Sequence, residues 1–333
     1  MTEQLEGTLR VLAYEGSFPE GYIGSFLRQN PALRFVHVPY DTDGEAIALL
    51  AAGEEADVLA SCVEETLAYF ISSGYLQPID VGRLTRWNEV LPWFRALPGV
   101  VEGDRVWMVP VDSAPTGLTF DTTQGPPPAS FADLFDESRA GRIAVDAKPV
   151  IALHVGALAL GIPDPPSMAP DQLERVKAFY LDLKRDGRFP VLWETFADIE
   201  RLYRDRTVVA SSGFPGDTLA LQRAGLPVGF AVASEGSMLF GCGFAIGRGC
   251  RNEEAAYAFL DDMLGAESQS YLATQKHFIV SNGSVLPSLR SEIGPVPHLE
   301  EAFLRDAAVP APPDDLDAWN EAWREVLEAP PST

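Results

Sequence analysis

The chain has 333 residues, 46% of them hydrophobic and 22% charged, and its 48 acidic against 25 basic residues give a formal net charge of −23 at pH 7. This length allows two ordinary domains with cores of their own, and the composition is that of a folded protein rather than a disordered one. The charge would repel nucleic-acid phosphates, and no apolar run approaches the roughly 18 residues of a membrane-spanning helix, so neither nucleic-acid binding nor membrane insertion is expected.

The first third of the chain alternates between strand and helix patterns. The elements expected there are a strand over 8–16, a helix over 19–30, a strand over 34–40, a helix over 43–53, a strand over 56–61, a helix over 62–74 and a hairpin over 100–111. This alternation is typical of a parallel sheet covered by helices on both faces.

The same pattern starts again at about residue 116. The expected elements are a strand over 116–122, a helix over 131–141, a strand over 142–147, helices over 150–161, 171–187 and 193–206, a strand over 207–212 and a helix over 217–225. A strand, loop and strand over 228–247 and helices over 252–265, 268–276 and 315–329 complete the chain. The sequence therefore predicts two α/β lobes.

The stretch EGSMLFGCGFAIG, residues 235–247, contains the glycine spacing G-x-G-x-x-x-G, which is close to a dinucleotide-binding signature. Such a signature belongs at a strand-to-helix turn, with an acidic residue about 20 positions later. Here the glycines lie inside a strand-like segment, and Glu253 and Glu254 come too early. A nucleotide enzyme is not predicted.

Cys62, Cys242 and Cys250 are too few and too scattered to predict a disulfide framework or a closed zinc site. No metal and no other cofactor is therefore expected. The opening residues MTEQLEGTLRVLAYEG contain no export signal. This indicates either a cytoplasmic protein or an exported one whose signal was removed.

Six segments in order resemble an extracellular solute-binding protein of an ABC transporter with the type II periplasmic-binding-protein fold, closest to the spermidine/putrescine-binding branch. They are LRVLAYEGSFPEG, ADVLASCVEETLAYFISSGYLQPID, VWMVPVDSAPTGLTFDT, SFADLFDESRAGRIAV, VASEGSMLFGCGFAIGRGCRNEEAAYAFLDDML and KHFIVSNGSVLP. The resemblance implies two Rossmann-like lobes joined by a two-strand hinge, with a small solute held between them and no chemistry. It also implies a monomer that works with a membrane permease and lies in the periplasm or is an extracellular lipoprotein.

The lobes are expected to be discontinuous. Lobe 1 takes residues 1–114 and 245–305, lobe 2 takes 115–244, and 306–333 form a C-terminal helical segment.

Carried over through the resemblance, the expected ligand-binding residues are Tyr14, Glu15, Ser17, Ser61, Cys62, Asp112, Ser113, Lys148, Trp193, Glu194, Ser211, Phe240 and Cys242. Tyr14 offers a ring face and a hydroxyl, and Glu15 a carboxylate for an ammonium group. Ser61 is also a candidate helix N-cap. Trp193 is expected to begin a helix, and a tryptophan there is more often a core residue than a ligand contact.

Two departures from the polyamine-binding pattern bear on the ligand. Lys148 and Ile151 stand near positions where polyamine binders carry carboxylates, and Cys242 stands where the family has an acid, although Phe240 keeps the stacking surface. A polyamine-like cation remains the first expectation. An amino acid, betaine or other carboxylate or phosphonate zwitterion, which would use Lys148, is the alternative.

Two alternatives of another class stay open at this point. A thiol enzyme on the same fold would pair Cys242 as nucleophile with His154 as base. A stand-alone effector sensor is the other, if the missing export signal is genuine.

Overall fold

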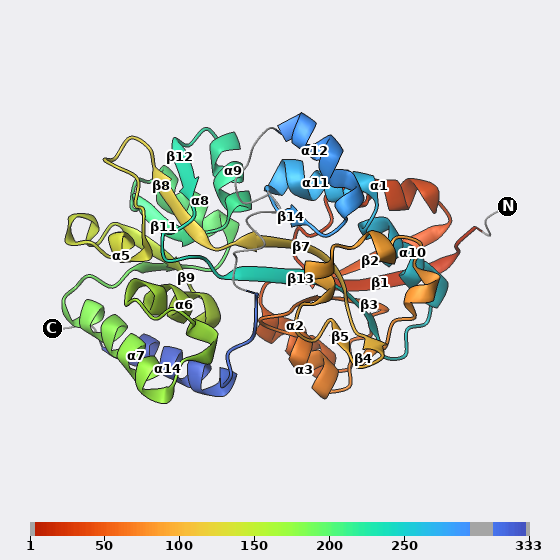
Figure 1. Ribbon diagram of the computed structural model, residues 1–333, viewed down its shortest axis with the longest axis horizontal. Helices are drawn as coiled ribbons and strands as arrows, with labels where there is room; N and C mark the ends of the chain where they lie inside the picture. The colour runs from red at the N-terminus through yellow and green to blue at the C-terminus, as the bar shows by residue number, and fades with distance from the viewer. Residues whose placement is uncertain (1–3, 294–308, 331–333) are drawn as a thin grey trace. The chain divides into compact units, whose positions relative to one another are not determined.

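The computed structural model describes residues 4–293 and 309–330. The chain divides into two compact units: unit 1 is Met1–Ser113 with Phe240–Arg305, and unit 2 is Ala114–Leu239 with Asp306–Thr333. The chain passes from one unit to the other at 113/114 and 239/240, whereas the sequence predicts lobe boundaries at 114/115 and 244/245. The boundary expected at 305/306 lies outside the described residues. Figure 1 shows the elements of both units.

Unit 1 is built on a mixed sheet in the order β14-β7-β13-β3-β1-β2, with β4 paired to β13. Its strands are β1 Gly7–Tyr14, β2 Leu33–Tyr40, β3 Val58–Cys62, β4 Leu76–Gln77, β7 Val109–Pro115, β13 Leu239–Gly247 and β14 Ile279–Val280. β1 runs parallel to both β2 and β3, whereas β13 is antiparallel to β3 and β14 is antiparallel to β7. A separate hairpin joins β5 Val101–Glu102 to β6 Arg105–Val106.

The helices of unit 1 follow its strands in the predicted alternation. They are α1 Glu20–Gln29, α2 Asp43–Ala51, α3 Leu67–Ser72, α4 Pro92–Arg95, α10 Glu253–Met263, α11 Ala266–Lys276 and α12 Leu286–Ile293, with 3-10 turns η1 Val81–Arg83, η2 Trp87–Glu89 and η5 Gly283–Val285. An aromatic cluster packs α1 and α10 against the sheet: the Phe259 ring lies 5.4 Å from Phe26 and 5.1 Å from Phe244 between centroids. Ring burial of this kind dominates core energetics.

Unit 2 has its own mixed sheet in the order β10-β9-β11-β8-β12. The strands are β8 Gly117–Asp121, β9 Ile143–Asp146, β10 Val191–Trp193, β11 Ala210–Gly213 and β12 Val228–Ala231. β9 is parallel to both β10 and β11, and β8 returns antiparallel to β11. With the two mixed sheets, the predicted α/β class is confirmed.

Helices cover both faces of the unit 2 sheet. Alternate residues of a strand point to opposite faces, so neighbouring residues of β9 belong to different core clusters. Val145 of β9 joins a core cluster with residues of α6 Pro149–Ala159, α7 Pro170–Arg185 and α14 Leu316–Glu328, whereas Ala144 joins a second cluster under α8 Phe196–Arg204. The remaining helices are α5 Phe131–Leu134, α9 Pro215–Arg223 and the 3-10 turns η3 Glu137–Arg139 and η4 Pro165–Ser167. The expected C-terminal helix therefore packs as part of the unit 2 core.

The glycine run of residues 235–247 lies in and just before β13, not at a strand-to-helix turn. A Cβ on Gly243 would clash with the backbone carbonyl oxygen of Val109 in β7, so only glycine fits there. The spacing therefore serves close strand packing and is not a pyrophosphate cradle.

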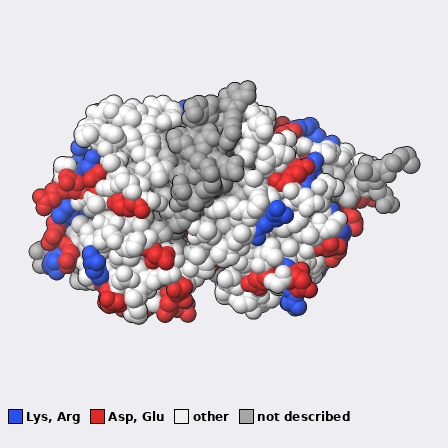
Figure 2. Space-filling model, viewed as in Figure 1, with Lys and Arg blue, Asp and Glu red and all other residues white. Residues whose placement is uncertain are grey.

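No helix in the described part of the chain is long and apolar enough to cross a bilayer. On the face shown in Figure 2, acidic and basic side chains lie interspersed over the surface. Exposed ion pairs, such as Arg185 with Asp182 at 2.6 Å, contribute little stability each.

Candidate functional site

Each unit has one strand at which the strand order reverses. In unit 1 this is β1, which lies between β3 and β2, and in unit 2 it is β9, which lies between β11 and β10. In open α/β sheets the loops at the carboxyl ends of such strands diverge and leave room for a ligand. A ligand site is therefore expected at the carboxyl ends of β1 and β9.

The turn after β1 carries Tyr14, Glu15 and Ser17. The Ser17 N–H donates to the Tyr14 carbonyl oxygen at 3.1 Å, and Gly16 has a φ of +73°, a left-handed conformation that favours glycine. Glu15 is exposed, whereas Tyr14 and Ser17 are half-buried. The turn thus fixes Tyr14 at the edge of the sheet and leaves the Glu15 carboxylate facing solvent.

The Tyr14 hydroxyl is shared by two carboxylates that come from opposite sides of β1. It donates a short hydrogen bond to Asp43, the first residue of α2, and lies 3.3 Å from Glu65 Oε2 in the loop after β3. Thr42 caps α2, accepting from the Glu45 N–H at 3.2 Å, and this places Asp43 as the first residue of the helix. Two acids thus converge on one hydroxyl that carries a single proton.

A second tyrosine lines the same edge. Tyr40 ends β2 opposite Tyr14, and the two ring centroids are 4.5 Å apart with the planes tilted by 54°. The edge of unit 1 therefore combines aromatic faces with carboxylates. This combination suits a positively charged group, which rings attract through their quadrupoles and carboxylates through hydrogen bonds.

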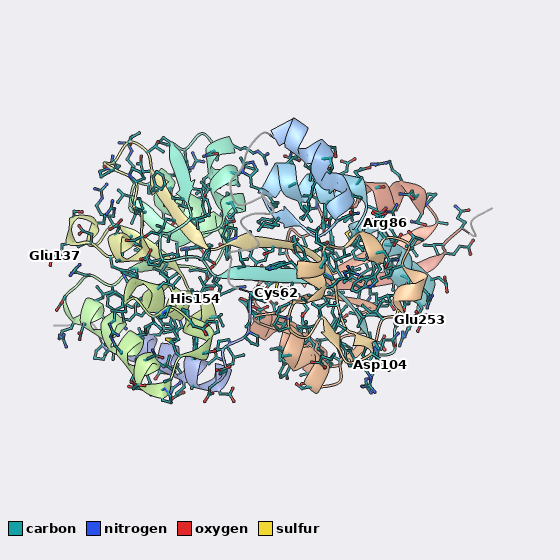
Figure 3. The ribbon with its side chains drawn as sticks, in the orientation of Figure 1. Cys62, Arg86, Asp104, Glu137, His154 and Glu253 are labelled. Atoms are coloured by element: carbon teal, nitrogen blue, oxygen red, sulfur yellow. A yellow bond between two sulfur atoms is a disulfide. The ribbon has the colours of Figure 1, made fainter. Side chains whose placement is uncertain are left out.

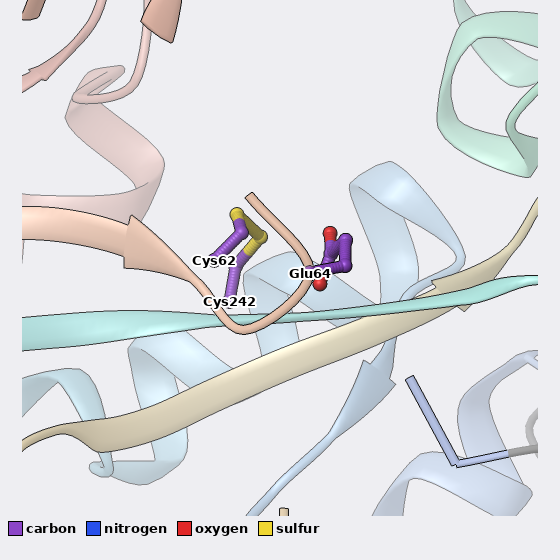
Figure 4. A group of neighbouring side chains, drawn as sticks. All are labelled: Cys62, Glu64 and Cys242. Atoms are coloured by element: carbon purple, nitrogen blue, oxygen red, sulfur yellow. A yellow bond between two sulfur atoms is a disulfide. The ribbon is translucent and has the colours of Figure 1, made fainter. Parts of the chain in front are cut away.

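Cys62 and Cys242 are joined by a single disulfide (Figure 4), a pairing that the sequence analysis did not predict. The two residues are directly opposed in the antiparallel pair β3–β13, with Cα atoms 4.1 Å apart, although 180 positions separate them in the sequence. Ser61 lies within β3 and is not a helix N-cap, because α3 starts later with Thr66 before it. The Ser61 hydroxyl lies 2.9 Å from Thr66 Oγ1.

Glu64 lies beside the disulfide and is only 2% exposed. Its Oε2 accepts a hydrogen bond from the backbone N–H of Gly241 at 3.1 Å. The carboxylate is thus held next to Cys242, the position where the sequence lacks the acid expected from the polyamine-binding pattern. Phe240, which precedes Gly241, is half-buried and meets the Phe278 ring edge-on at 5.1 Å.

Asp112 and Ser113 lie in β7, paired with Val280 and Ile279 of β14. Asp112 is 7% exposed, and burial raises its pKa to about 7, opposed only in part by the positive charge of Lys276. The Ser113 hydroxyl is fully buried without a hydrogen-bond partner among the described residues. Both side chains are therefore enclosed in unit 1.

In unit 2, Lys148 follows β9 and stands at the N-cap of α6, half-buried. Its backbone N–H donates to Asp146 Oδ1 at 2.9 Å, and the Asp146 N–H donates to the Ser212 hydroxyl of β11 at 3.0 Å. These bonds fix the loop after β9. Lys148 thus places a cation at the start of a helix, where the helix dipole also favours an anion.

The other candidates of unit 2 differ in burial: Trp193 and Ser211 are buried, whereas Glu194 is exposed. Trp193 ends strand β10 and does not begin a helix as expected; it is 5% exposed in the cluster under α8, with no partner for its indole N–H among the described residues. Ser211 is fully buried, and its hydroxyl lies 3.0 Å from that of Tyr203.

The thiol-enzyme alternative is wrong. Cys242 has no free thiol because it is bonded to Cys62. His154 lies on α6 of unit 2, in the middle of the helix (Figure 3), and burial lowers its pKa to about 3, so it stays neutral in the core. This pair of residues therefore supplies no activated nucleophile.

The structure brings Tyr14, Cys62 and Cys242 to the carboxyl edge of the unit 1 sheet. Sequence reasoning missed the three acids Asp43, Glu64 and Glu65, which look like ordinary helix-start residues. One signal could have identified them. Asp43 follows β2, and Glu64 and Glu65 follow β3, the two strands that flank β1. Loops at the carboxyl ends of such neighbouring parallel strands bring side chains of separate segments together.

Comparison with solved structures supports the fold. The spermidine/putrescine substrate-binding protein PotD of Streptococcus pneumoniae superposes with a TM-score of 0.78 at 15% identity, covering 98% of each chain. A putative spermidine/putrescine ABC transporter protein of Listeria monocytogenes gives 0.82 at 16% identity, covering 96% of this chain and 99% of that one. The binding protein MotA of A. tumefaciens, solved with glucopine, gives 0.74 at 18%, covering 96% and 99%.

A comparison with curated protein sequences finds no match. The family model of the bacterial extracellular solute-binding proteins matches residues 22–293, most of the chain and parts of both units. The chain belongs to the bacterial extracellular solute-binding protein family, and its role is solute binding rather than catalysis.

Proposed function

We propose that the solute is a small organic cation with primary ammonium groups, of the spermidine or putrescine type. The observation that carries this proposal is the Tyr14 hydroxyl shared between Asp43 and Glu65 at the carboxyl end of β1. An ammonium group has three donors and no acceptor, so it satisfies several carboxylate oxygens at once. Charge-assisted bonds of this kind are about twice as strong as neutral ones.

The surroundings of this pair support a cationic solute. Tyr14, which is half-buried, presents a ring face for the methylene chain and for cation–π contact, with the buried Tyr40 ring 4.5 Å from it between centroids. The net charge of −23 raises the local concentration of cations around the protein. Two of the similar solved structures carry spermidine/putrescine in their names.

A zwitterion is the second candidate, and Lys148 favours it. This side chain stands at the N-cap of α6, and α6 is 11 residues long, so its first N–H groups and the lysine charge would both serve a carboxylate. MotA, which is similar in fold, was solved with glucopine. An amino-acid-like or opine-like solute would use Lys148 for its carboxylate.

The biological setting follows from the solute-binding role. We infer that the protein acts outside the cytoplasmic membrane, in the periplasm or as a lipoprotein, and delivers the solute as a monomer to a membrane permease. No cofactor is needed for capture.

The two candidates are separated by melting-temperature shifts of the purified chain, since a solute that binds only the native state raises the melting point. Putrescine, spermidine, γ-aminobutyrate, betaine and a phosphonate are tested on the wild type and on three variants. We expect shifts with the polyamines that disappear in Asp43→Asn/Glu65→Gln and persist in Lys148→Gln.

Glu102→Gln is the matched control, because it removes one exposed charge of unit 1 in the hairpin β5–β6. It should bind like the wild type. Shifts only with zwitterions, lost in Lys148→Gln, would replace the first candidate with the second.

A further inference from the structure

We propose that Cys62, Cys242 and Glu64 form, once the disulfide is reduced, a binding site for a soft divalent metal ion such as Zn²⁺. The site is distinct from solute capture and does not depend on the solute's identity. The ligand atoms of the three residues already lie within 4.8 Å of one another. This is the distance range in which one metal ion bridges three donors. Figure 4 shows the three side chains beside one another.

The strand pairing places the two sulfurs on the same side. Cys62 and Cys242 are opposite partners in the β3–β13 ladder, and opposed residues in an antiparallel pair project to the same face with Cβ atoms about 4.5–5.5 Å apart or less. Two sulfurs bound to one tetrahedral Zn²⁺ at about 2.3 Å each are separated by about 3.8 Å. Rotation of the two side chains about their Cα–Cβ bonds is therefore sufficient, with no strand movement.

The third donor is already held in place. Glu64 is 2% exposed, and its Oε2 accepts from the N–H of Gly241, the residue before Cys242. Hydrogen bonds to a ligating carboxylate orient it and are a regular part of metal sites. The Cys62 N–H donates in turn to Thr66 Oγ1 at 3.3 Å, which fixes the loop between Cys62 and Glu64. The donor set is therefore preorganised on both strands.

Opening the site requires a dithiol. One thiolate of the dithiol attacks a disulfide sulfur to give a mixed disulfide, and its second thiolate resolves this, leaving Cys62 and Cys242 as thiols and the dithiol as a cyclic disulfide. The dithiol supplies two electrons and two protons. When the metal ion binds, the two cysteine protons pass to solvent. Two thiolates and one carboxylate then surround the 2+ ion, and the site carries a net charge of 1−.

The chemistry selects the class of metal. Thiolates favour Zn²⁺, Cd²⁺ and similar ions, whereas Ca²⁺ and Mg²⁺ need oxygen ligands. Three protein donors leave a fourth tetrahedral position for water. Cys242 is half-buried rather than enclosed, so the site opens to solvent on the side of β13.

The test uses the whole purified chain, reduced with dithiothreitol, desalted without oxygen and titrated with Cd²⁺ and Zn²⁺. We expect one ion per chain, with the ultraviolet thiolate-to-cadmium charge-transfer band, and the same Zn²⁺ stoichiometry by chelator competition. The oxidised chain should show neither. Cys250→Ser, which removes the one thiol that is free in the oxidised structure, should bind as the wild type does.

Cys242→Ser should lose the band, and Glu64→Gln, which keeps the disulfide and the fold, should weaken Cd²⁺ binding by about tenfold or more. If Cys242→Ser fails to fold, Glu64→Gln alone decides. Equal metal binding by the oxidised and reduced chains, no band on reduction, unchanged affinity in Glu64→Gln, or loss of binding in Cys250→Ser would overturn the proposal.

Discussion

Glu64 Oε2 accepts a hydrogen bond from the buried N–H of Gly241 at 3.1 Å, which ties the loop after β3 to strand β13. The bond brings a carboxylate to the disulfide of Cys62 and Cys242. One side chain thus links strand β13 to the loop at the carboxyl end of β3.

Removing this acceptor should be costly, whereas removing its charge should not. Glu64→Ala leaves the Gly241 N–H buried without a partner, and we expect it to lower the free energy of unfolding by about 1–3 kcal/mol. Glu64→Gln keeps an amide oxygen in its place and should stay close to the wild type. Urea unfolding of both variants measures the difference; equal losses would show that the charge, not the hydrogen bond, stabilises the fold.

Reduction of the disulfide should lower stability. The bond closes a loop of 180 residues, and loop-closure entropy predicts a loss of about 2–5 kcal/mol when a bond of this span is cut. The midpoint of urea unfolding should fall in the reduced wild type and in Cys62→Ser, and it should not change in Cys250→Ser. An unchanged midpoint after verified reduction would mean that the strand pairing alone holds β3 to β13.

Asp112 should make stability depend on pH. Its folded-state pKa is about 7 because it is buried, whereas its ordinary value is 3.8, so between these pH values the native state holds a proton that the unfolded state has lost. Stability therefore falls as the pH rises from about 4 to 7, by about 4 kcal/mol for a shift of this size.

Asp112→Asn removes the titrating group beside Tyr22 and Lys276, which are the groups that interact electrostatically with it. The variant should be more stable than the wild type at pH 8 and equal to it near pH 4, measured by urea unfolding at a series of pH values. A wild type whose stability rises across this range relative to the variant would contradict the assignment.

Two glycines should respond to alanine with opposite signs. Gly243→Ala places a methyl against the Val109 carbonyl of β7, where backbone cannot move aside, and should destabilise by about 1–3 kcal/mol or more. Gly44→Ala, in the first turn of α2 with no atom nearer than 3.9 Å to the new methyl, should stabilise by about 0.5–1 kcal/mol. Thermal unfolding of the two variants measures both effects, and a Gly243→Ala variant as stable as the wild type would contradict the close approach of β13 to β7.

The fold could be predicted because its signals are local. Alternating strand and helix patterns lie within windows of about ten residues, and both lobes repeat them. The ends of elements differ more from the prediction than their order does. The helix expected to begin at Trp193 begins at Phe196, because Thr195 caps it and Trp193 completes β10.

The site could be predicted only in part, because its partners come from distant segments. Tyr14 follows the first predicted strand and lies at its edge as expected, but Asp43 and Glu65 reach it across the sheet from segments 29 and 51 positions away. The disulfide was missed for the same reason: only the antiparallel return of β13 beside β3 brings Cys242 to Cys62.

The nature of the solute is tested most directly by isothermal titration calorimetry of spermidine and putrescine into the wild type and Asp43→Asn/Glu65→Gln. We predict one-site binding to the wild type and a loss of at least about tenfold in affinity for each charge-assisted bond removed, with weaker binding at high salt. No binding of either polyamine to the wild type, together with binding of a carboxylate solute that is lost in Lys148→Gln, would contradict the proposal.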